Sequence, residues 1–251
     1  MRSPLIHIAE LSHIFDDGKT GIKEINLDIF PGEFIILAGR NGSGKTTLLR
    51  HLNGLLHPSS GRIRVNGKPV SSHLLETRKT IGMVFQDPDT QIVADTVFDE
   101  TAFGLENLKT DRKTLDRIVT QVLIRLDLIH LKDRNPATLS GGEKRRLAIA
   151  GILVMEPAVI VFDEPFSNLD YPGTLSVLGA IKALHRSGQT IIIAAHDVEP
   201  IICEATRMII MTGGQISLDD SPMAILCRLE SFGIKAPCAV KMGKPPQPWL
   251  D

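Results

Sequence analysis

Cysteine is scarce in this sequence, and the positions of the three cysteines exclude two common uses. Cys203, Cys227 and Cys238 show neither a C-x-x-C spacing nor an even count, which argues against a zinc site and against a disulfide framework. We expect ordinary reduced thiols. The eight histidines form no H-x-x-x-H motif and no cluster with cysteine. We therefore expect no metal site that consists of protein side chains alone.

Long hydrophobic runs and a charge excess of one sign are also absent. The longest uncharged apolar run, residues 147–155, is far shorter than the roughly 20 residues that cross a bilayer, so we expect no membrane span. No apolar segment precedes the first acidic residues, so we expect no secretory signal and a cytosolic chain. A net charge of −1 gives no overall electrostatic reason to expect nucleic acid as a partner. The 251 residues allow one large α/β domain with a helical insertion, or two smaller domains.

Residues 34–47 contain the most informative motif of the chain. Residues 34–38 are bulky and apolar, which predicts a strand buried on both faces. The next residues match G-x-x-x-x-G-K-[ST], and leucines at helical spacing follow from Leu48. A glycine-rich turn between a buried strand and a helix N-terminus is the context in which this motif binds phosphate groups.

The residue types of this turn suit a phosphate chain and a magnesium ion. Backbone N–H groups of the glycines can surround an anion, Lys45 supplies a cation for the terminal phosphates, and the Thr46 hydroxyl can complete a Mg²⁺ shell. The nucleotide-binding residues that we expect here are Gly39, Asn41, Gly42, Ser43, Gly44, Lys45, Thr46 and Thr47.

Turn residues predict antiparallel sheet on both sides of this motif. Residues 6–29 alternate in character around a turn at residues 16–18, and Asn66 with Gly67 marks a second hairpin. Phe15 lies at the first turn, where its ring could stack on a nucleotide base or close the core of the hairpin. The spacing favours neither alternative.

Polar side chains follow three further buried strands, predicted at residues 81–85, 158–162 and 190–195. Ligands of open α/β sheets bind beyond the carboxyl ends of the strands, so Asp163, Glu164 and His196 are expected beside the phosphate loop. One of the two acids can hold Mg²⁺ while the other orients a water as general base. Gln86 could also reach the ligand, although its local sequence favours a solvated loop residue.

Residues 96–155 have a mainly helical pattern, which predicts a helical subdomain inserted into the α/β core. Inside it a small-residue turn opens a helix at Ser140, so a second anion-binding helix N-terminus is plausible. The local sequence favours a simpler interpretation, in which the helix is only capped and residues 144–146 form a solvated basic face. After a hairpin-like pair at residues 208–218 and a short helix at 221–227, several prolines predict an extended, mobile end from Phe232 onward.

Together these motifs resemble the ATP-binding cassette (ABC) ATPases up to about residue 222. In the family's order, the chain carries a Walker A loop (39–47), a Q-loop glutamine (Gln86), a signature (139–143), Walker B acids (Asp163 and Glu164), a D-loop (167–170) and a switch histidine (His196). The resemblance implies an α/β P-loop NTPase fold with a mainly parallel sheet, an antiparallel β subdomain and an inserted α-helical subdomain. We expect an ATPase domain at 1–222, with its core at about 1–88 and 158–222 and the helical subdomain at about 89–157, and a tail at 223–251.

The same resemblance implies roles for individual residues. Phe15 would stack on adenine, and Ser140, Gly141 and Gly142 would contact the ATP held by a second ABC subunit, in a homodimer or a heterodimer. Catalysis would involve Glu164, His196 and Gln86. The cofactors would be ATP and Mg²⁺, with Thr46, Gln86 and Asp163 at the metal.

Residues 84–91 and 96–107 resemble, more narrowly, the cobalt-type and energy-coupling-factor branch of the family. This resemblance implies import of a vitamin or a transition-metal ion, at the cytoplasmic face of the cell membrane. The partners would be a transmembrane coupling protein, docked near Asp89 and Gln91, and a substrate-binding membrane subunit, without nucleic acid. The alternative is a soluble ABC ATPase acting on nucleic acid or ribosomes, but neither a second cassette nor a long coiled-coil insertion is visible. A third possibility, a small-molecule P-loop kinase, does not account for the signature at residues 139–143.

Three positions depart from the common family pattern. Glu143 replaces the usual glutamine of the signature, Phe15 stands where tyrosine is more usual, and the tail after Ser221 is short. A stacking ring and a polar residue at the helix start are both retained, so we expect the first two changes to be tolerated. The short tail argues against a dimerisation or regulatory role for the C-terminal end.

Overall fold

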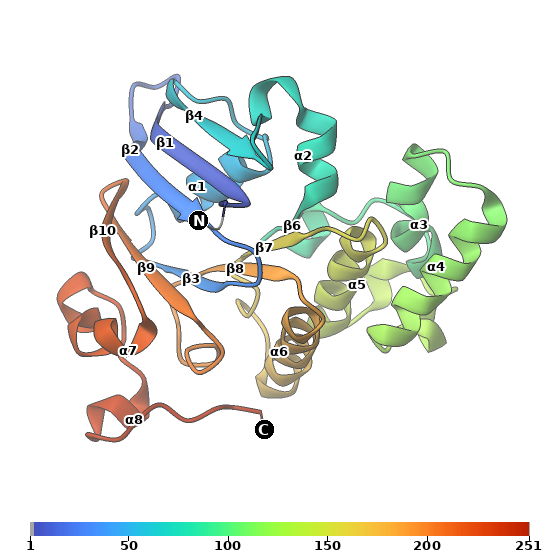
Figure 1. Ribbon diagram of the computed structural model, residues 1–251. Helices are drawn as coiled ribbons and strands as arrows, with labels where there is room; N and C mark the ends of the chain where they lie inside the picture. Colours follow the sequence, from blue (N-terminus) through green and yellow to red (C-terminus); the bar gives the residue numbers. More distant parts are fainter. Residues whose placement is uncertain (1–2, 251) are drawn as a thin grey trace.

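An antiparallel sheet, a central sheet and a block of helices make up the computed structural model of this protein (Figure 1). The structure describes residues 3–250. Residues 1, 2 and 251, which the expected domain ranges include, lie outside the described part of the chain.

The antiparallel sheet has the strand order β2-β1-β4-β5. Its strands are β1 (Ile6–Ile14), β2 (Thr20–Ile29), β4 (Ser60–Val65) and β5 (Lys68–Pro69). Asn66 and Gly67 join β4 to β5 with φ angles of 50° and 76°, the left-handed pair that a tight hairpin turn requires. Both predicted hairpins are therefore confirmed.

The central sheet contains the four strands predicted to be buried. Its order is β10 (Gln215–Asp220), β9 (Arg207–Thr212), β3 (Phe34–Ala38), β8 (Thr190–Ala195), β7 (Val159–Asp163) and β6 (Ile81–Val84). From β9 to β6 the strands run parallel, and β10 is antiparallel at the edge. The predicted α/β class with a mainly parallel sheet is confirmed.

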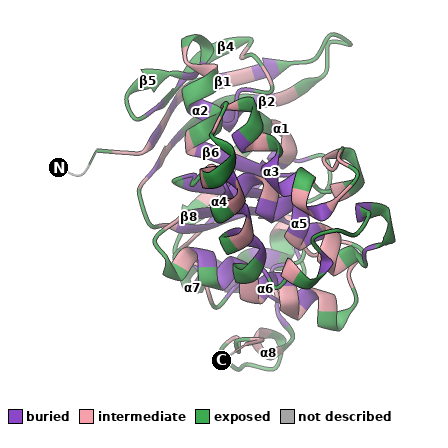
Figure 2. Ribbon diagram, turned by 90° about the vertical axis from the view of Figure 1, so that its right-hand side faces the viewer, coloured by how far each residue is buried: buried purple, intermediate pink, exposed green. Residues whose placement is uncertain are grey.

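Both faces of this sheet are covered, which explains the continuous apolar runs. Alternate residues of β3 enter different cores: Phe34 and Ile36 pack with the helices, whereas Ile35 and Leu37 pack beneath the antiparallel sheet. Figure 2 shows the resulting buried strands between the two layers. Because β3, β6, β7 and β8 run parallel, their carboxyl ends meet at one edge of the sheet.

Helices fill the chain between β6 and β7, as the sequence predicts. The longer helices of this segment are α3 (Val97–Asn107), α4 (Arg112–Arg125) and α5 (Gly141–Leu153). Outside it lie α1 (Lys45–Leu52), α2 (Leu74–Thr80) and α6 (Tyr171–Arg186). Short 3₁₀ turns lie at Val70–Ser72, Pro88–Thr90, Ile129–Leu131 and Pro136–Thr138. Within residues 3–250 no helix is long and apolar enough to cross a membrane.

The end from Phe232 onward packs against the core, so the prediction of an extended end is wrong. The C-terminal part of the chain forms α7 (Pro222–Ile225), a 3₁₀ segment (Leu226–Phe232) and α8 (Cys238–Lys241). Ile234 is buried in the main core, and the Lys182 ammonium donates to the carbonyl oxygen of Leu250 at 2.7 Å. The Trp249 ring lies 5.6 Å from that of Tyr171, at the start of α6. Proline limits the backbone here but does not prevent its docking.

Candidate functional site

The phosphate loop connects the end of β3 to the start of α1. Gly44 is the N-cap of α1 and has a φ of 102°, which disfavours residues with a side chain. A Cβ at this position would lie 2.8 Å from the carbonyl oxygen of Gly21. Because glycine cannot cap a helix with a side chain, the first turn of α1 keeps N–H groups for an external anion.

Lys45 is a desolvated cation inside this loop. Its side chain is 6% exposed, and its ammonium donates to the carbonyl oxygens of Gly39 at 2.7 Å and Arg40 at 3.2 Å. Burial lowers the pKa of Lys45 from its usual value, and the nearby carboxylates of Glu164 and Asp163 oppose that shift. A desolvated cation interacts strongly with an anionic ligand, because little solvent screens the two charges.

Thr46 and Asp163 bring two oxygen donors together from different elements. The Thr46 hydroxyl donates to Oδ1 of Asp163 at 3.0 Å, at the carboxyl end of β7. Burial raises the pKa of Asp163, although the bond from Thr46 works in the opposite direction. A buried carboxylate and a hydroxyl are oxygen ligands of the kind that Mg²⁺ prefers, and a cation would compensate the cost of burial. These residues therefore fit a magnesium ion.

Glu164 contacts two other candidate residues, one with each carboxylate oxygen. Its Oε1 lies 3.8 Å from the Lys45 ammonium, and its Oε2 lies 2.7 Å from Nδ1 of His196. The backbone of Glu164 has a φ of 50°, in the left-handed region, and its N–H donates to the carbonyl oxygen of Ala194. Such backbone strain persists where the surrounding structure enforces it, often at functional sites.

These groups surround a cleft of about 490 Å³. It is lined by Phe15, Lys19, Thr20, Gly21, Asn41, Gly42, Ser43, Gly44, Lys45, Thr46, Thr47, Gln86, Glu164 and His196. Most of the residues predicted from separate stretches are thus brought together, and Gly39 and Asp163 adjoin them through Lys45 and Thr46. The Phe15 ring is 40% exposed, so it lines the cleft rather than closing the hairpin core. Lys19, Thr20 and Gly21 were not expected, and their only signal was the neighbouring hairpin turn.

The signature residues Ser140, Gly141 and Gly142 do not line this cleft. Ser140 caps α5: its hydroxyl accepts from the N–H of Glu143 at 3.3 Å, and the Glu143 carboxylate accepts from the N–H of Ser140 at 2.7 Å. These bonds also lower the pKa of Glu143. The carboxylate that replaces the usual glutamine therefore completes a capping box. Gly141 lines a different hollow, of about 330 Å³, together with Gln86 and Asn168.

Arg145 contradicts the interpretation of residues 144–146 as a solvated face. It is 2% exposed, and its guanidinium donates to the carbonyl oxygens of Phe85 and Gln86, each at 2.7 Å, and of Ser167 at 3.5 Å. It joins the signature helix to the backbone around Gln86 and to the segment after Glu164. No local sequence signal distinguishes it from Arg146, which is half-buried and bonds to Ser176.

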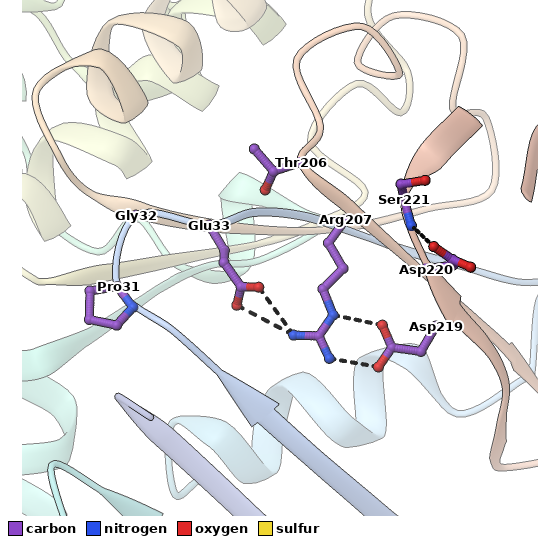
Figure 3. A pocket seen from close by; sticks show the side chains of 8 residues that line it. All are labelled: Pro31, Gly32, Glu33, Thr206, Arg207, Asp219, Asp220 and Ser221. Atoms are coloured by element: carbon purple, nitrogen blue, oxygen red, sulfur yellow. Dashed lines mark hydrogen bonds and ion pairs between the residues drawn. The ribbon is translucent and has the colours of Figure 1, made fainter. Parts of the chain in front are cut away.

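Another hollow, of about 520 Å³, lies near the start of β3, away from the carboxyl ends of the parallel strands (Figure 3). Three of its charged groups are paired: Arg207 donates to both oxygens of Asp219 at 2.6 Å and to Glu33 at 3.2 Å. The carboxylate of Asp220 accepts from the backbone N–H of Ser221. The hydrogen bonds that Arg207 donates to Asp219 are the main reason that the pKa of Arg207 is raised. These bonds stabilise the junction of β3, β9 and β10, and the hollow shares no lining residue with the cleft.

The fold and the cleft define a P-loop nucleotide-binding protein, with acids and a histidine at the ends of adjacent strands beside the phosphate loop. The family profile described as ABC transporter matches residues 22–167. A putative ABC transporter ATP-binding protein of Halobacterium salinarum is 40% identical over 93% of this chain and 100% of its own length. The energy-coupling factor transporter ATP-binding protein EcfA1 of Halalkalibacterium halodurans is 44% identical, over 88% of this chain and 81% of that protein.

A solved structure agrees with these sequence matches. The structure of cbiO1 from Clostridium perfringens, described as part of the ABC transporter complex cbiONQ, superposes with a TM-score of 0.82. It is 36% identical and covers 92% of this chain and 93% of the other. The chain belongs to the ATP-binding proteins of ABC transporters, in the energy-coupling factor branch, and is an ATPase that hydrolyses ATP for transport. The predicted family and branch are confirmed.

Proposed function

We propose that this chain binds MgATP in the cleft around Lys45 and uses its hydrolysis to power import of a small solute, a vitamin or a transition-metal ion, through a membrane partner. The observation that carries the proposal is the position of Glu164 between the Lys45 ammonium and the ring of His196, beside the pair formed by Asp163 and Thr46. The base, the phosphate-binding cation and the oxygen donors for a metal ion thus belong to one cleft.

The proposed roles follow from chemistry and placement. The phosphate loop (Gly39, Asn41, Gly42, Ser43, Gly44, Lys45, Thr46 and Thr47) binds the phosphates, and Phe15 binds the base. Thr46, Asp163 and Gln86 would hold Mg²⁺, which would neutralise charge on the phosphate oxygens. Glu164 orients the attacking water and accepts its proton, and His196 keeps the carboxylate in place by donating to Oε2.

A second ABC subunit completes the site in this proposal. Ser140, Gly141 and Gly142 lie at the N-terminus of α5 and outside the cleft of their own chain, where they would be free to contact nucleotide on a partner. ATP binding would close the two subunits, and hydrolysis would reopen them. We further propose that residues 1–222 act as the ATPase domain, with the helical subdomain at about 89–157 and the tail at 223–251.

The importer assignment rests on the relatives. Energy-coupling factor proteins match most of this chain, and the similar cbiO1 structure is described as part of a transporter complex. We place the chain at the cytoplasmic face of the membrane, bound to a transmembrane coupling protein beside a substrate-binding subunit. The exposed side chain of Asp89 lines the same hollow as Gln86 and Gly141. Asp89 remains the proposed docking point for the coupling protein. The side chain of Gln91 bonds instead to the backbone N–H of Phe85.

Co-expression with the products of the neighbouring reading frames, among which the proposal expects membrane proteins, tests it. After detergent extraction, we expect the chain to co-elute with them on size-exclusion chromatography, and the complex to hydrolyse MgATP. A complex that contains Lys45→Ala is the control, and it should assemble without hydrolysis. If the chain elutes apart from these membrane proteins while RNA or ribosomes stimulate its hydrolysis, the soluble alternative replaces the importer.

A further inference from the structure

Three aromatic rings connect the interior of the protein to the mouth of the cleft. The ring of His13 lies 4.6 Å from that of Phe15, at an interplanar angle of 83°, and 4.8 Å from that of His51, at 68°. His51 belongs to α1, the helix that begins with Lys45. Exposure rises along the series, from fully buried His51 through His13 at 9% to Phe15 at 40%. The exposed ring of Phe15 therefore packs against the buried ring of His13.

His13 is fixed in place by a hydrogen bond to the backbone. Its Nδ1 lies 3.1 Å from the carbonyl oxygen of His57, and because a carbonyl oxygen only accepts, Nδ1 is the donor. The segment that carries this carbonyl is itself attached to β1, since Ser59 donates to the carbonyl oxygen of Ser12 and its hydroxyl accepts from the N–H of Ile14. The hydrogen bond to His57 thus orients the His13 ring, and the bonds of Ser59 to β1 hold the segment that supplies this carbonyl.

Besides His13, the Phe15 ring lies against Gly21. A Cβ at Gly21 would lie 2.7 Å from Cε2 of Phe15 and 3.1 Å from the methyl group of Thr47, so the ring lies over a glycine beside the phosphate loop. The backbone of Phe15 is held by the turn, through bonds with Lys19 and Gly18. What remains free is rotation of the ring, and the edge contact with His13 limits it.

We infer that His13 is a positioning residue that orients Phe15 for stacking on the base of the bound nucleoside triphosphate. This inference rests on the proposed role of Phe15 in nucleotide binding. His13 does not line the cleft and acts only through the ring that it contacts. Its effect should therefore depend on the presence of a base, whereas the phosphate loop binds the triphosphate group without one.

Comparison of MgATP with magnesium tripolyphosphate, which has no base, tests the inference by calorimetric titration. His13→Asn keeps a donor for the His57 carbonyl but removes the ring, and His13→Phe keeps a ring but removes the donor. Loss of one edge-to-face ring contact should weaken MgATP binding about 2- to 10-fold in His13→Asn. Tripolyphosphate binding should not change, and His13→Phe should recover part of the affinity for MgATP, because it keeps the ring contact but loses the hydrogen bond that fixes the ring.

Two further variants separate the possible outcomes. His7→Asn, on the same strand β1, is the matched control and should bind both ligands normally. Phe15→Ala should lose affinity for MgATP alone. If Phe15→Ala does so while His13→Asn binds MgATP as the wild type does, only the positioning role of His13 is overturned. If His13→Asn loses both ligands equally, its role is structural. If Phe15→Ala binds MgATP normally, the proposed role of Phe15 fails as well.

Discussion

Nδ1 of His196 donates to Oε2 of Glu164 at 2.7 Å, although the two residues follow different strands of the central sheet. Neighbouring parallel strands β7 and β8 bring them together, since Asp163 pairs with Ala194. The other oxygen of Glu164 faces the Lys45 ammonium at 3.8 Å. The carboxylate is thus oriented at both oxygens, and general-base catalysis depends on a positioned side chain of this kind.

Glu164→Gln should bind MgATP normally but hydrolyse it about 10²- to 10⁴-fold more slowly, because an amide cannot accept the proton of the attacking water. The nearly isosteric amide keeps the packing. Because hydrolysis reopens the two subunits in the proposed cycle, a nucleotide-bound pair should accumulate. Steady-state hydrolysis and light scattering with MgATP and with MgADP measure both effects. Asp163→Asn is the comparison and should also weaken the Mg²⁺ dependence. Wild-type turnover in Glu164→Gln would assign the base elsewhere, with His196 examined next.

Lys45→Ala should weaken MgATP binding about 10- to 100-fold, which corresponds to loss of one charge-assisted contact with the phosphates. Lys19→Ala is a matched control, because Lys19 lines the same cleft but is exposed and paired with Asp17. It should change the affinity by less than a few-fold, since exposed ion pairs contribute about 1 kcal/mol or less. Equilibrium titration with a fluorescent ATP analogue measures both variants, and equal affinities would refute the role of Lys45.

Ser140→Arg should leave MgATP binding nearly unchanged and abolish hydrolysis, because Ser140 lies outside the cleft of its own chain. Loss of the N-cap should cost about 1 kcal/mol of stability, which a thermal unfolding curve detects as a small decrease in Tm. The arginine would block the approach of a second subunit's nucleotide. If hydrolysis continued at the wild-type rate, the site would be complete within one chain.

The features that the sequence predicted are those with local signals. Phe34 to Ala38 and the other buried strands are continuous apolar runs, and the hairpins carry Asn66 with Gly67 or a similar turn. The polar residues after these strands converge because parallel strands end at the same edge. Asp163, Glu164 and His196 could therefore be placed without knowledge of the tertiary structure.

The features that the sequence missed depend on contacts between distant segments. The guanidinium of Arg145 binds the carbonyl of Phe85, which is 60 positions away, and backbone acceptors carry no sequence signature. Lys182 and Leu250 are 68 positions apart, and a proline-rich composition does not reveal such docking. The ring contacts of His13 likewise join β1 to α1. Burial and partners of such residues follow from packing alone.

Arg145→Met should destabilise the protein by about 1–3 kcal/mol, because the carbonyls of Phe85 and Gln86 lose a buried donor. Hydrolysis should slow while MgATP affinity is kept, since the backbone of Gln86 is no longer tied to the signature helix. Lys144→Met is the matched control: Lys144 precedes Arg145 and forms an ion pair with the exposed Asp89. Urea unfolding and steady-state kinetics compare the two, and equal effects would show that Arg145 has no special role.

His51 should make the protein sensitive to acid. Burial, followed by the nearby His13, lowers the pKa of His51 from 6.5 to about 4. The unfolded chain therefore binds more protons than the folded one between these pH values, so the free energy of unfolding is greatest above pH 6.5 and falls as the pH decreases toward 4. At 1.36 kcal/mol per pH unit the loss amounts to about 3 kcal/mol. The variant His51→Leu is the reference, because leucine has a similar volume and no titrating group. The other titrating groups are the same in both proteins, so the difference between the two curves reports on His51. Urea unfolding of both proteins from pH 7.5 to 4.5 should show the stability of the wild type falling relative to that of the variant, whereas parallel curves would mean that His51 binds protons equally in the folded and unfolded states.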